Sequence, residues 1–204
     1  MATEPEPSSL PAARPTGAGP RPVPRITPGT RSELGVVNWI LCRLISSQAG
    51  VPDAQLFSTL GRTGRVFRGW LHYTLMLMPG GRLSRADTET IILRVAHRRS
   101  CRYELEHHTR IGRRAGIDEA ALARIRTGPD AAGLDRRARI LLTAVDELLD
   151  TRSLSASTAA MLSEHYSQAH LIEILLVITQ YDGLAAVLSA LEIVSDFASP
   201  AEET

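Results

Sequence analysis

The sequence has 204 residues, which is enough for one domain with a hydrophobic core and an extension. Its formal net charge is +1, a balance that favours neither nucleic acid nor an anionic membrane as a partner. All 23 basic residues are arginine, and the absence of lysine excludes Schiff-base catalysis, a lysine-anchored cofactor and a phosphate-binding loop built on lysine.

The start of the chain differs in composition from the rest. Residues 1–32 contain eight of the twelve prolines and no apolar run of the kind found in signal peptides. This composition predicts a disordered, proline-rich tail over residues 1–32 and a helical domain over residues 33–204. The two cysteines, Cys42 and Cys101, are too few for a disulfide framework, so we expect a reducing, cytoplasmic setting.

Apolar residues recur with helical spacing along most of the remaining chain, and no segment alternates with the two-residue period of a strand. The pattern therefore predicts an all-α fold. Helix-starting and helix-stopping residues place helices at residues 35–47, 52–60, 64–78, 84–98, 101–115, 118–125, 135–149 and 155–166. Two final apolar runs, 171–178 and 184–194, contain interrupting polar residues, so we expect burial at the centre or at a subunit interface rather than a membrane span.

The helix expected at residues 101–115 has an arginine-rich side and an apolar side. Glu104 and His108 lie on the apolar side, four residues apart, so their side chains can touch. Burial of such a pair is costly without a partner, and it shifts both pKa values towards the range used in acid–base catalysis. A structural pair that holds two helices in register is the alternative, and the helix alone does not decide between them.

The preceding helix, at residues 84–98, directs a second carboxylate inward. Its charged face, expected in solvent, contains Asp87, Arg94 and Arg98, and Glu89 lies on the other side. If the two helices pack as a hairpin, four side chains line one small pocket: Glu89, Cys101, Glu104 and His108.

The spacing of these residues resembles a known superfamily. Alkylhydroperoxidase D (AhpD) and its relatives carry a Glu, eleven residues, and then Cys-x-x-Cys-x-x-x-His; here Glu104 stands in place of the second cysteine. The related carboxymuconolactone decarboxylases resemble Glu-x-x-x-His without the cysteine pair, which matches Glu104 and His108. The resemblance covers roughly residues 56–197 and implies an AhpD-like helical bundle with a central buried helical hairpin.

Two chemistries fit these residues. Inward carboxylates beside a histidine suit proton transfer at carbon, with Glu89, Glu104 and His108 acting in a decarboxylation, isomerisation or elimination. The alternative is a thiol peroxidase in which Cys101 attacks a hydroperoxide and an external thiol completes the cycle, since position 104 cannot form the usual disulfide. A non-catalytic homologue is a further alternative, because fold does not fix function.

Weaker candidates complete the prediction. Arg102 or an arginine of another subunit would bind a substrate carboxylate, and His72 and His107 are possible substrate contacts. We expect no cofactor and no metal, because the single Glu-x-x-His at residues 104–107 lacks the second copy that di-iron bundles use. The expected partners are a small-molecule substrate and further copies of the chain, since members of the resembled superfamily are commonly trimers or hexamers. Nucleic acid and membrane are not expected partners.

Overall fold

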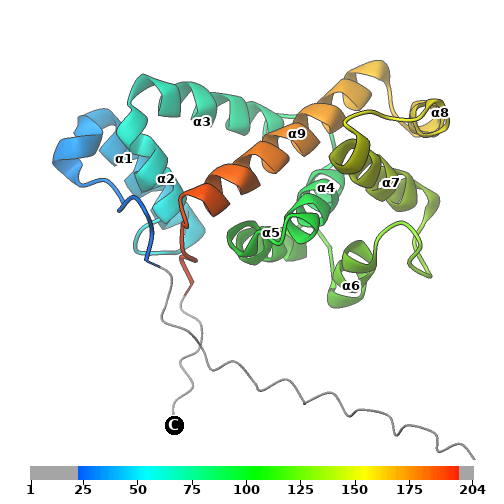
Figure 1. The fold of residues 1–204 in the computed structure, drawn as a ribbon, viewed down its shortest axis with the longest axis horizontal. Helices are drawn as coiled ribbons and strands as arrows, with labels where there is room; N and C mark the ends of the chain where they lie inside the picture. Colours follow the sequence, from blue (N-terminus) through cyan, green and yellow to red (C-terminus); the bar gives the residue numbers. More distant parts are fainter. Residues whose placement is uncertain (1–22, 198–204) are drawn as a thin grey trace, which may run out of the picture.

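The computed structural model describes residues 23–197, and every regular element within this range is helical (Figure 1). The expected all-α fold class is confirmed for this part of the chain. The elements are α1 (Arg31–Ala49), α2 (Gln55–Leu60), the 3₁₀ turn η1 (Gly61–Thr63), α3 (Arg65–Leu77), α4 (Arg85–Arg98), α5 (Arg102–Arg114), α6 (Glu119–Thr127), α7 (Arg136–Thr151), α8 (Ala156–His165) and α9 (Gln168–Ala190).

The tail expected over residues 1–32 overlaps the described chain only at residues 23–32, and residues 1–22 lie outside the described residues. The backbone N–H of Arg25 donates to the carbonyl of Leu191 at 3.0 Å, and its guanidinium pairs with Glu192 at 2.8 Å. Helix α1 begins at Arg31, before the expected domain boundary at residue 33. The N–H of Gly29 also donates to the carbonyl of Ser58 at 2.9 Å, so this segment is bonded both to the end of α9 and to α2.

Side-chain caps set the starts of five helices. A side-chain oxygen accepts a hydrogen bond from a backbone N–H of the first turn in α4, α6, α7, α8 and α9, at Ser84, Asp118, Asp135, Ser155 and Ser167. Helix α2 begins at Gln55 rather than at Pro52. Ala54 keeps a non-helical conformation, in which its N–H donates to Ser46 Oγ at 2.9 Å.

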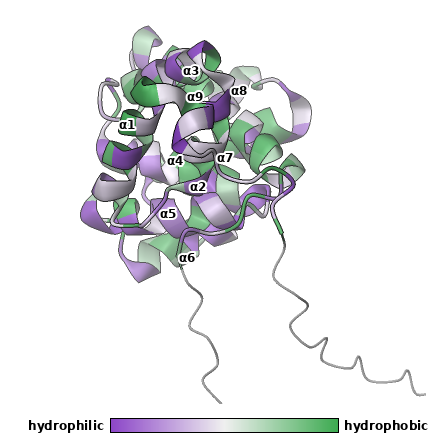
Figure 2. Cartoon of the chain, turned by 90° about the vertical axis from the view of Figure 1, so that its left-hand side faces the viewer, coloured by the Kyte–Doolittle hydropathy of each residue, from purple (hydrophilic) through white to green (hydrophobic). Residues whose placement is uncertain are grey.

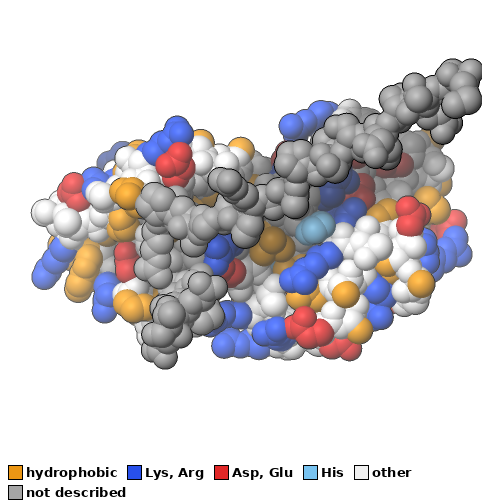
Figure 3. Space-filling model, turned by 60° about the horizontal axis from the view of Figure 1, so that its bottom comes forward, with side chains coloured by type: hydrophobic (Ala, Val, Ile, Leu, Met, Phe, Trp, Pro, Cys, Tyr) orange, Lys and Arg blue, Asp and Glu red, His pale blue; other side chains and the backbone are white. Residues whose placement is uncertain are grey.

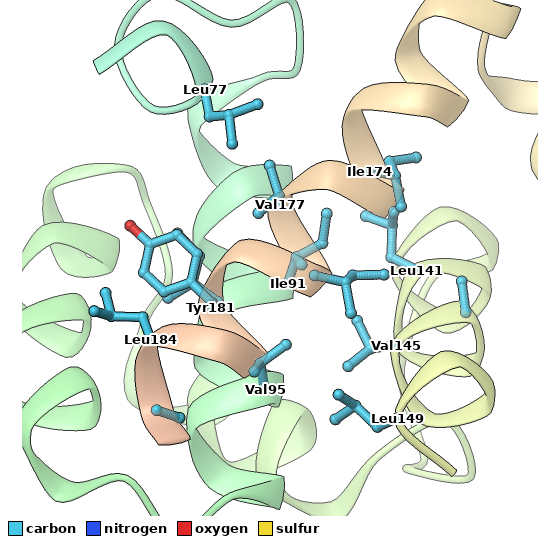
Figure 4. Packing of buried hydrophobic residues seen from close by; sticks show 14 of the residues in the cluster. Leu77, Ile91, Val95, Leu141, Val145, Leu149, Ile174, Val177, Tyr181 and Leu184 are labelled. Carbon is cyan, nitrogen blue, oxygen red and sulfur yellow. The ribbon is translucent and has the colours of Figure 1, made fainter. Parts of the chain in front are cut away.

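Helix α4 lies at the centre of the domain and packs against α5, α7 and α9 (Figure 1). Aliphatic side chains of three helices interdigitate there (Figure 4), namely Ile91 and Val95 of α4, Leu141 and Val145 of α7, and Ile174 and Val177 of α9. Each is almost completely buried. Burial of such a side chain stabilises the fold by about 1.5–3 kcal/mol, so this cluster fixes the position of α4.

The two apolar runs expected at residues 171–178 and 184–194 belong mainly to one continuous helix, α9, which passes through Tyr181 without a break. Among the described helices, α9 alone has the length and composition that a membrane span requires. Its buried side chains pack against α3, α4, α7 and α8, whereas Ile172, Leu176 and Val187 remain exposed.

Helix α1 buries Leu34 and Cys42 together with two polar residues, and it exposes several apolar ones. Asn38 is buried and its amide donates to the carbonyl of Gly61 at 2.8 Å, whereas Val36, Ile40 and Leu44 are exposed. Figure 2 shows hydrophobic and hydrophilic residues alternating along the ribbon on this side of the molecule. Exposed apolar residues at helical spacing are typical of an interaction surface, and we call Val36, Ile40 and Leu44 the α1 stripe.

Candidate active site

The α4–α5 hairpin has a very short connection. Ser100 adopts a left-handed conformation with φ of 52°, and the N–H of Cys101 donates to the carbonyl of Ala96 at 2.8 Å. Cys101 is itself the N-cap residue of α5. The two helices pack side by side, so residues at similar distances from the connection face each other. Glu89 of α4 and His108 of α5 meet in this way.

Glu89 and His108 form a direct hydrogen bond. Nδ1 of His108 lies 2.7 Å from Oε2 of Glu89, whose side chain is completely buried. The sequence suggested Glu104 as the partner of His108, since these residues are four apart on one helix. The structure pairs His108 with Glu89 instead, because the α4–α5 hairpin places that carboxylate directly opposite the ring.

Glu104 is also buried, with only 2% of its surface exposed. Neither of its carboxyl oxygens has a hydrogen-bond partner among the described residues. Burial raises the pKa of Glu104 to about 8; the neighbouring Cys101 thiol opposes this rise, and the charge of Asp182 adds to it. Glu104 is therefore mainly protonated at neutral pH and can donate a proton.

Cys101 lies next to Glu104 and is also buried. A helix N-terminus normally favours a thiolate, but burial, with the Glu104 charge as the second cause, raises the pKa of Cys101 to about 12. The thiol is protonated at neutral pH. The four side chains that the sequence assigned to the pocket thus form two pairs, Glu89 with His108 and Cys101 with Glu104, and the charges of both glutamates act on Tyr181. We call these four residues the cluster.

Two further residues lie next to the cluster and were missed from the sequence. Arg85 lies one turn before Glu89 on α4, with Nε 3.2 Å from Glu89 Oε1. Tyr181 of α9 packs edge-on against the His108 ring at a centroid distance of 5.1 Å, and its hydroxyl donates to Met78 Sδ at 2.9 Å. The four-residue spacing of Arg85 and Glu89 was a usable signal. Tyr181 gave none, since it reaches the cluster only through tertiary packing.

The environment of Tyr181 keeps its hydroxyl neutral. Burial, together with the charges of Glu89 and Glu104, raises the pKa of Tyr181 well above its usual value. The ring closes one side of the aliphatic cluster, and its hydroxyl points away from Val145 and Leu149 (Figure 4). Tyr181 is therefore a hydrogen-bond donor near the carboxylates rather than an acid or base.

The weaker candidates lie outside the cluster. Arg102 is exposed and pairs with Glu106 at 2.7 Å, and His72 is exposed on α3. His107 is on another side of α5, where Nε2 lies 3.0 Å from Asp196 Oδ2. These positions do not support the expected substrate contacts within one chain, because the side chains face solvent or the C-terminal segment.

Three features outside the cluster concern possible ligands: metal-binding groups, a surface hollow and the surface charge. Within residues 23–197, no group of three or more His, Cys, Asp and Glu side chains is arranged to hold a metal ion. An apolar hollow of about 370 Å³ lies between α3 and α9, lined in part by Phe67, Trp70 and Leu184. Arginine and acidic side chains are interspersed on the face seen in Figure 3, so this surface carries no field of a single sign.

The region that contains the α4–α5 hairpin resembles a known protein family. Residues 64–147 match the model of the carboxymuconolactone decarboxylase family. This part of the chain resembles that family, and the chain shares its fold with an AhpD-core protein. The matched region holds Arg85, Glu89, Cys101, Glu104 and His108, and Tyr181 lies outside it. Among curated proteins, no sequence matches this chain.

Several solved structures share the fold of this chain. An AhpD-core, peroxidase-related protein from Ralstonia eutropha JMP134 is 17% identical, with a TM-score of 0.75 over 85% of this chain and 93% of that chain. A peroxidase-related protein from Silicibacter sp. TM1040 is also 17% identical, with a TM-score of 0.70 over 79% and 85% of the two chains. The debrominase Bmp8 is 16% identical, with a TM-score of 0.69 over 83% and 91%. At these identities the likeness concerns the fold.

Proposed function

We propose that this protein is an enzyme that transfers protons on a small organic substrate in a decarboxylation, isomerisation or elimination. The observation that carries the proposal is the carboxyl group of Glu104, buried without a hydrogen-bond partner in the cluster that contains the Glu89–His108 pair. A carboxyl group placed in this way is costly for stability. It is also the kind of group that catalysis uses.

Each polar group has a distinct role in this proposal. Glu89 accepts the Nδ1–H of His108, so the tautomer assigned from this hydrogen bond leaves the lone pair on Nε2 as the base. Glu104 is the acid. In an isomerisation, Nε2 removes a proton from one carbon and Glu104 delivers one to another. In a decarboxylation, the electron pair left when carbon dioxide departs takes the proton of Glu104.

The thiol peroxidase hypothesis is the second candidate, and it rests on Cys101 at the N-terminus of α5 and on the peroxidase-related structures that share the fold. A peroxidatic cysteine attacks as the thiolate. A pKa of about 12 leaves almost no thiolate at neutral pH, whereas a pKa of about 8 suits Glu104 to proton donation. The same burial therefore favours Glu104 over Cys101 as the reacting group.

Solvent exchange tests the proposal before the natural substrate is known. The wild-type protein is incubated in D₂O with a panel of small carboxylic acids, lactones and ketones, and NMR follows the replacement of C–H by C–D. We expect catalysed exchange that Glu104→Gln reduces by about 10²–10⁴-fold. Glu164→Gln, which changes an exposed glutamate of α8, is the matched control and should exchange at the wild-type rate. Equal exchange by wild type and Glu104→Gln would refute the role of Glu104.

A hydroperoxide assay tests the second candidate. Wild-type protein is mixed with an organic hydroperoxide and a dithiol, and dimedone is used to trap a sulfenic acid at Cys101. We expect no turnover and no adduct, and Cys101→Ser should keep most of the exchange activity. Rapid peroxide reduction that Cys101→Ser abolishes would replace the proton-transfer proposal with the thiol mechanism.

A further inference from the structure

The positive charge of the chain is unevenly distributed. Residues 23–86 contain eight arginines and two acidic residues, whereas residues 87–197 contain thirteen arginines and sixteen acidic residues. Within residues 54–86, which include α2, η1, α3 and the start of α4, there are five arginines and no acidic residue. The net charge of +1 therefore conceals a cationic part around α3, which contrasts with the mixed charges of the lower face (Figure 3).

Helix α3 exposes basic and apolar residues together. It lies at the upper edge of the domain (Figures 1 and 2), and its Phe67 and Leu71 pack into a buried group with side chains of α1. Arg65, His72 and Met76 follow one another at helical spacing along its exposed side. The exposed large apolar side chains of this helix are Val66, Tyr73, Leu75 and Met76. Arginines among exposed apolar and aromatic side chains are typical of helices that lie at a membrane interface.

Helix α9 extends this apolar surface. Of the 18 residues in its most apolar stretch, only 39% are buried, and its exposed large side chains are Ile172, Leu176 and Val187. The two carboxylates of α9 are bound within the chain: Glu173 accepts from backbone N–H groups before α4, and Asp182 pairs with two arginines. The hollow between α3 and α9 is lined in part by Val66 and Val187, so it joins the exposed side chains of both helices. We call the exposed apolar side chains of α3 and α9, together with Arg65 and Arg68, the α3–α9 surface.

We propose that the α3–α9 surface binds reversibly to an anionic lipid bilayer. The arginines attract anionic headgroups, and the apolar side chains enter the boundary between headgroups and acyl chains. A second copy of the same surface would bring like charges together, and a nucleic acid would leave the apolar side chains without an apolar contact. A bilayer with anionic lipids supplies both kinds of contact. The net charge of the whole chain does not indicate this partner, because attraction depends on the charge of the face that meets it.

This inference goes beyond the proposed function and does not depend on the cluster. Flotation of the full chain with vesicles tests it, and vesicles of phosphatidylcholine are compared with vesicles that also contain phosphatidylglycerol. We expect binding to the anionic vesicles only, and weaker binding at high salt. Arg65→Gln should weaken this binding about fivefold and Met76→Gln about tenfold. Arg136→Gln, which removes the same charge from an exposed position of α7, is the matched control and should bind like wild type.

Tryptophan emission reports which part of the chain meets the lipid. The chain has two tryptophans, so Trp39→Phe leaves Trp70 of the hollow as the reporter. Its emission should shift to shorter wavelength when anionic vesicles are added, because acyl chains replace water beside the ring. An emission that does not change while the protein floats would show that another face binds, and the α3–α9 surface would be excluded.

Two further results would overturn the inference. One is the absence of flotation with anionic vesicles at low salt, and the other is wild-type binding by both Arg65→Gln and Met76→Gln. If wild type fails to float and Met76→Gln lowers the mass in light scattering, the surface is instead an interface between copies of the chain. Thermal unfolding checks that each variant folds. Glu104→Gln should float like wild type, so loss of the proposed catalytic role would leave the vesicle result unaffected.

Discussion

Replacement of Glu104 by glutamine should change how stability depends on pH. The side chain has an ordinary pKa of 4.5 when unfolded and about 8 in the folded protein. Between these values the unfolded chain releases a proton that the folded protein retains, so the free energy of unfolding falls as pH rises and levels off above pH 8. Between pH 5 and pH 8 the free energy of unfolding of the wild type should fall by about 3 to 4 kcal/mol, since one pKa unit corresponds to 1.36 kcal/mol. The glutamine side chain of the variant cannot ionise, so the substitution removes this loss.

Urea denaturation of both proteins at pH 5, 6, 7 and 8 measures the difference. Subtraction of the two curves cancels the other titrating groups, and a fixed protein concentration cancels any contribution from assembly. The variant should gain stability relative to wild type as pH rises, and Glu164→Gln should follow wild type throughout. A flat difference curve would show that Glu104 ionises normally in the folded protein, and the argument for a buried neutral proton donor would be refuted.

Three further predictions concern stability and assembly. Arg94→Met should destabilise the fold by about 1–3 kcal/mol in urea denaturation, because it removes the donor to the carbonyls of Ile125 and Arg126, while Arg98 still pairs with Asp146; an unchanged stability would contradict this. Asp196→Asn should cost about 1–3 kcal/mol, since Asp196 accepts from the Gln55 N–H at one oxygen and from Tyr103 at the other, and an amide has a single acceptor oxygen; unchanged thermal stability would count against it. We propose that the chain forms a homo-oligomer, so light scattering should give a mass above 22.2 kDa that Ile40→Glu in the α1 stripe lowers, whereas a wild-type monomer at micromolar concentration would refute the proposal.

Local sequence signals predicted the helical character of the chain and three of the inward residues. Cap residues fix helix starts through bonds within one turn, so Ser84 could be recognised without knowledge of the fold. The 3.6-residue period likewise placed Glu89, Glu104 and His108 on buried faces. These features depend on residues close in the chain.

Long-range pairing could not be inferred in the same way. Arg94 was expected in solvent with the charged face of its helix, but only 5% of it is exposed. The structure buries it because it binds the Asp146 carboxylate and donates to the carbonyls of Ile125 and Arg126 at 3.0 and 2.6 Å. Tyr181 similarly joins the candidate site from α9. The type of a charged or aromatic residue does not reveal a partner that is far away in the sequence. The helical period therefore assigned Arg94 to the solvent-facing side of α4, which is wrong.

This chain differs from the AhpD pattern in having Glu104 where the pattern has its second cysteine. The position of Glu104 in the α4–α5 hairpin gives this difference a chemical consequence. Position 104 is almost completely buried, and burial disfavours the charged form of any acid placed there or beside it. For a thiol this is a handicap, because the reactive species is the anion and Cys101 is held protonated. For a carboxyl group it is an advantage, because the useful species is the neutral acid, and a pKa of about 8 lies close to neutral pH. One buried environment thus works against the chemistry of the Cys-x-x-Cys members and supports proton donation by Glu104.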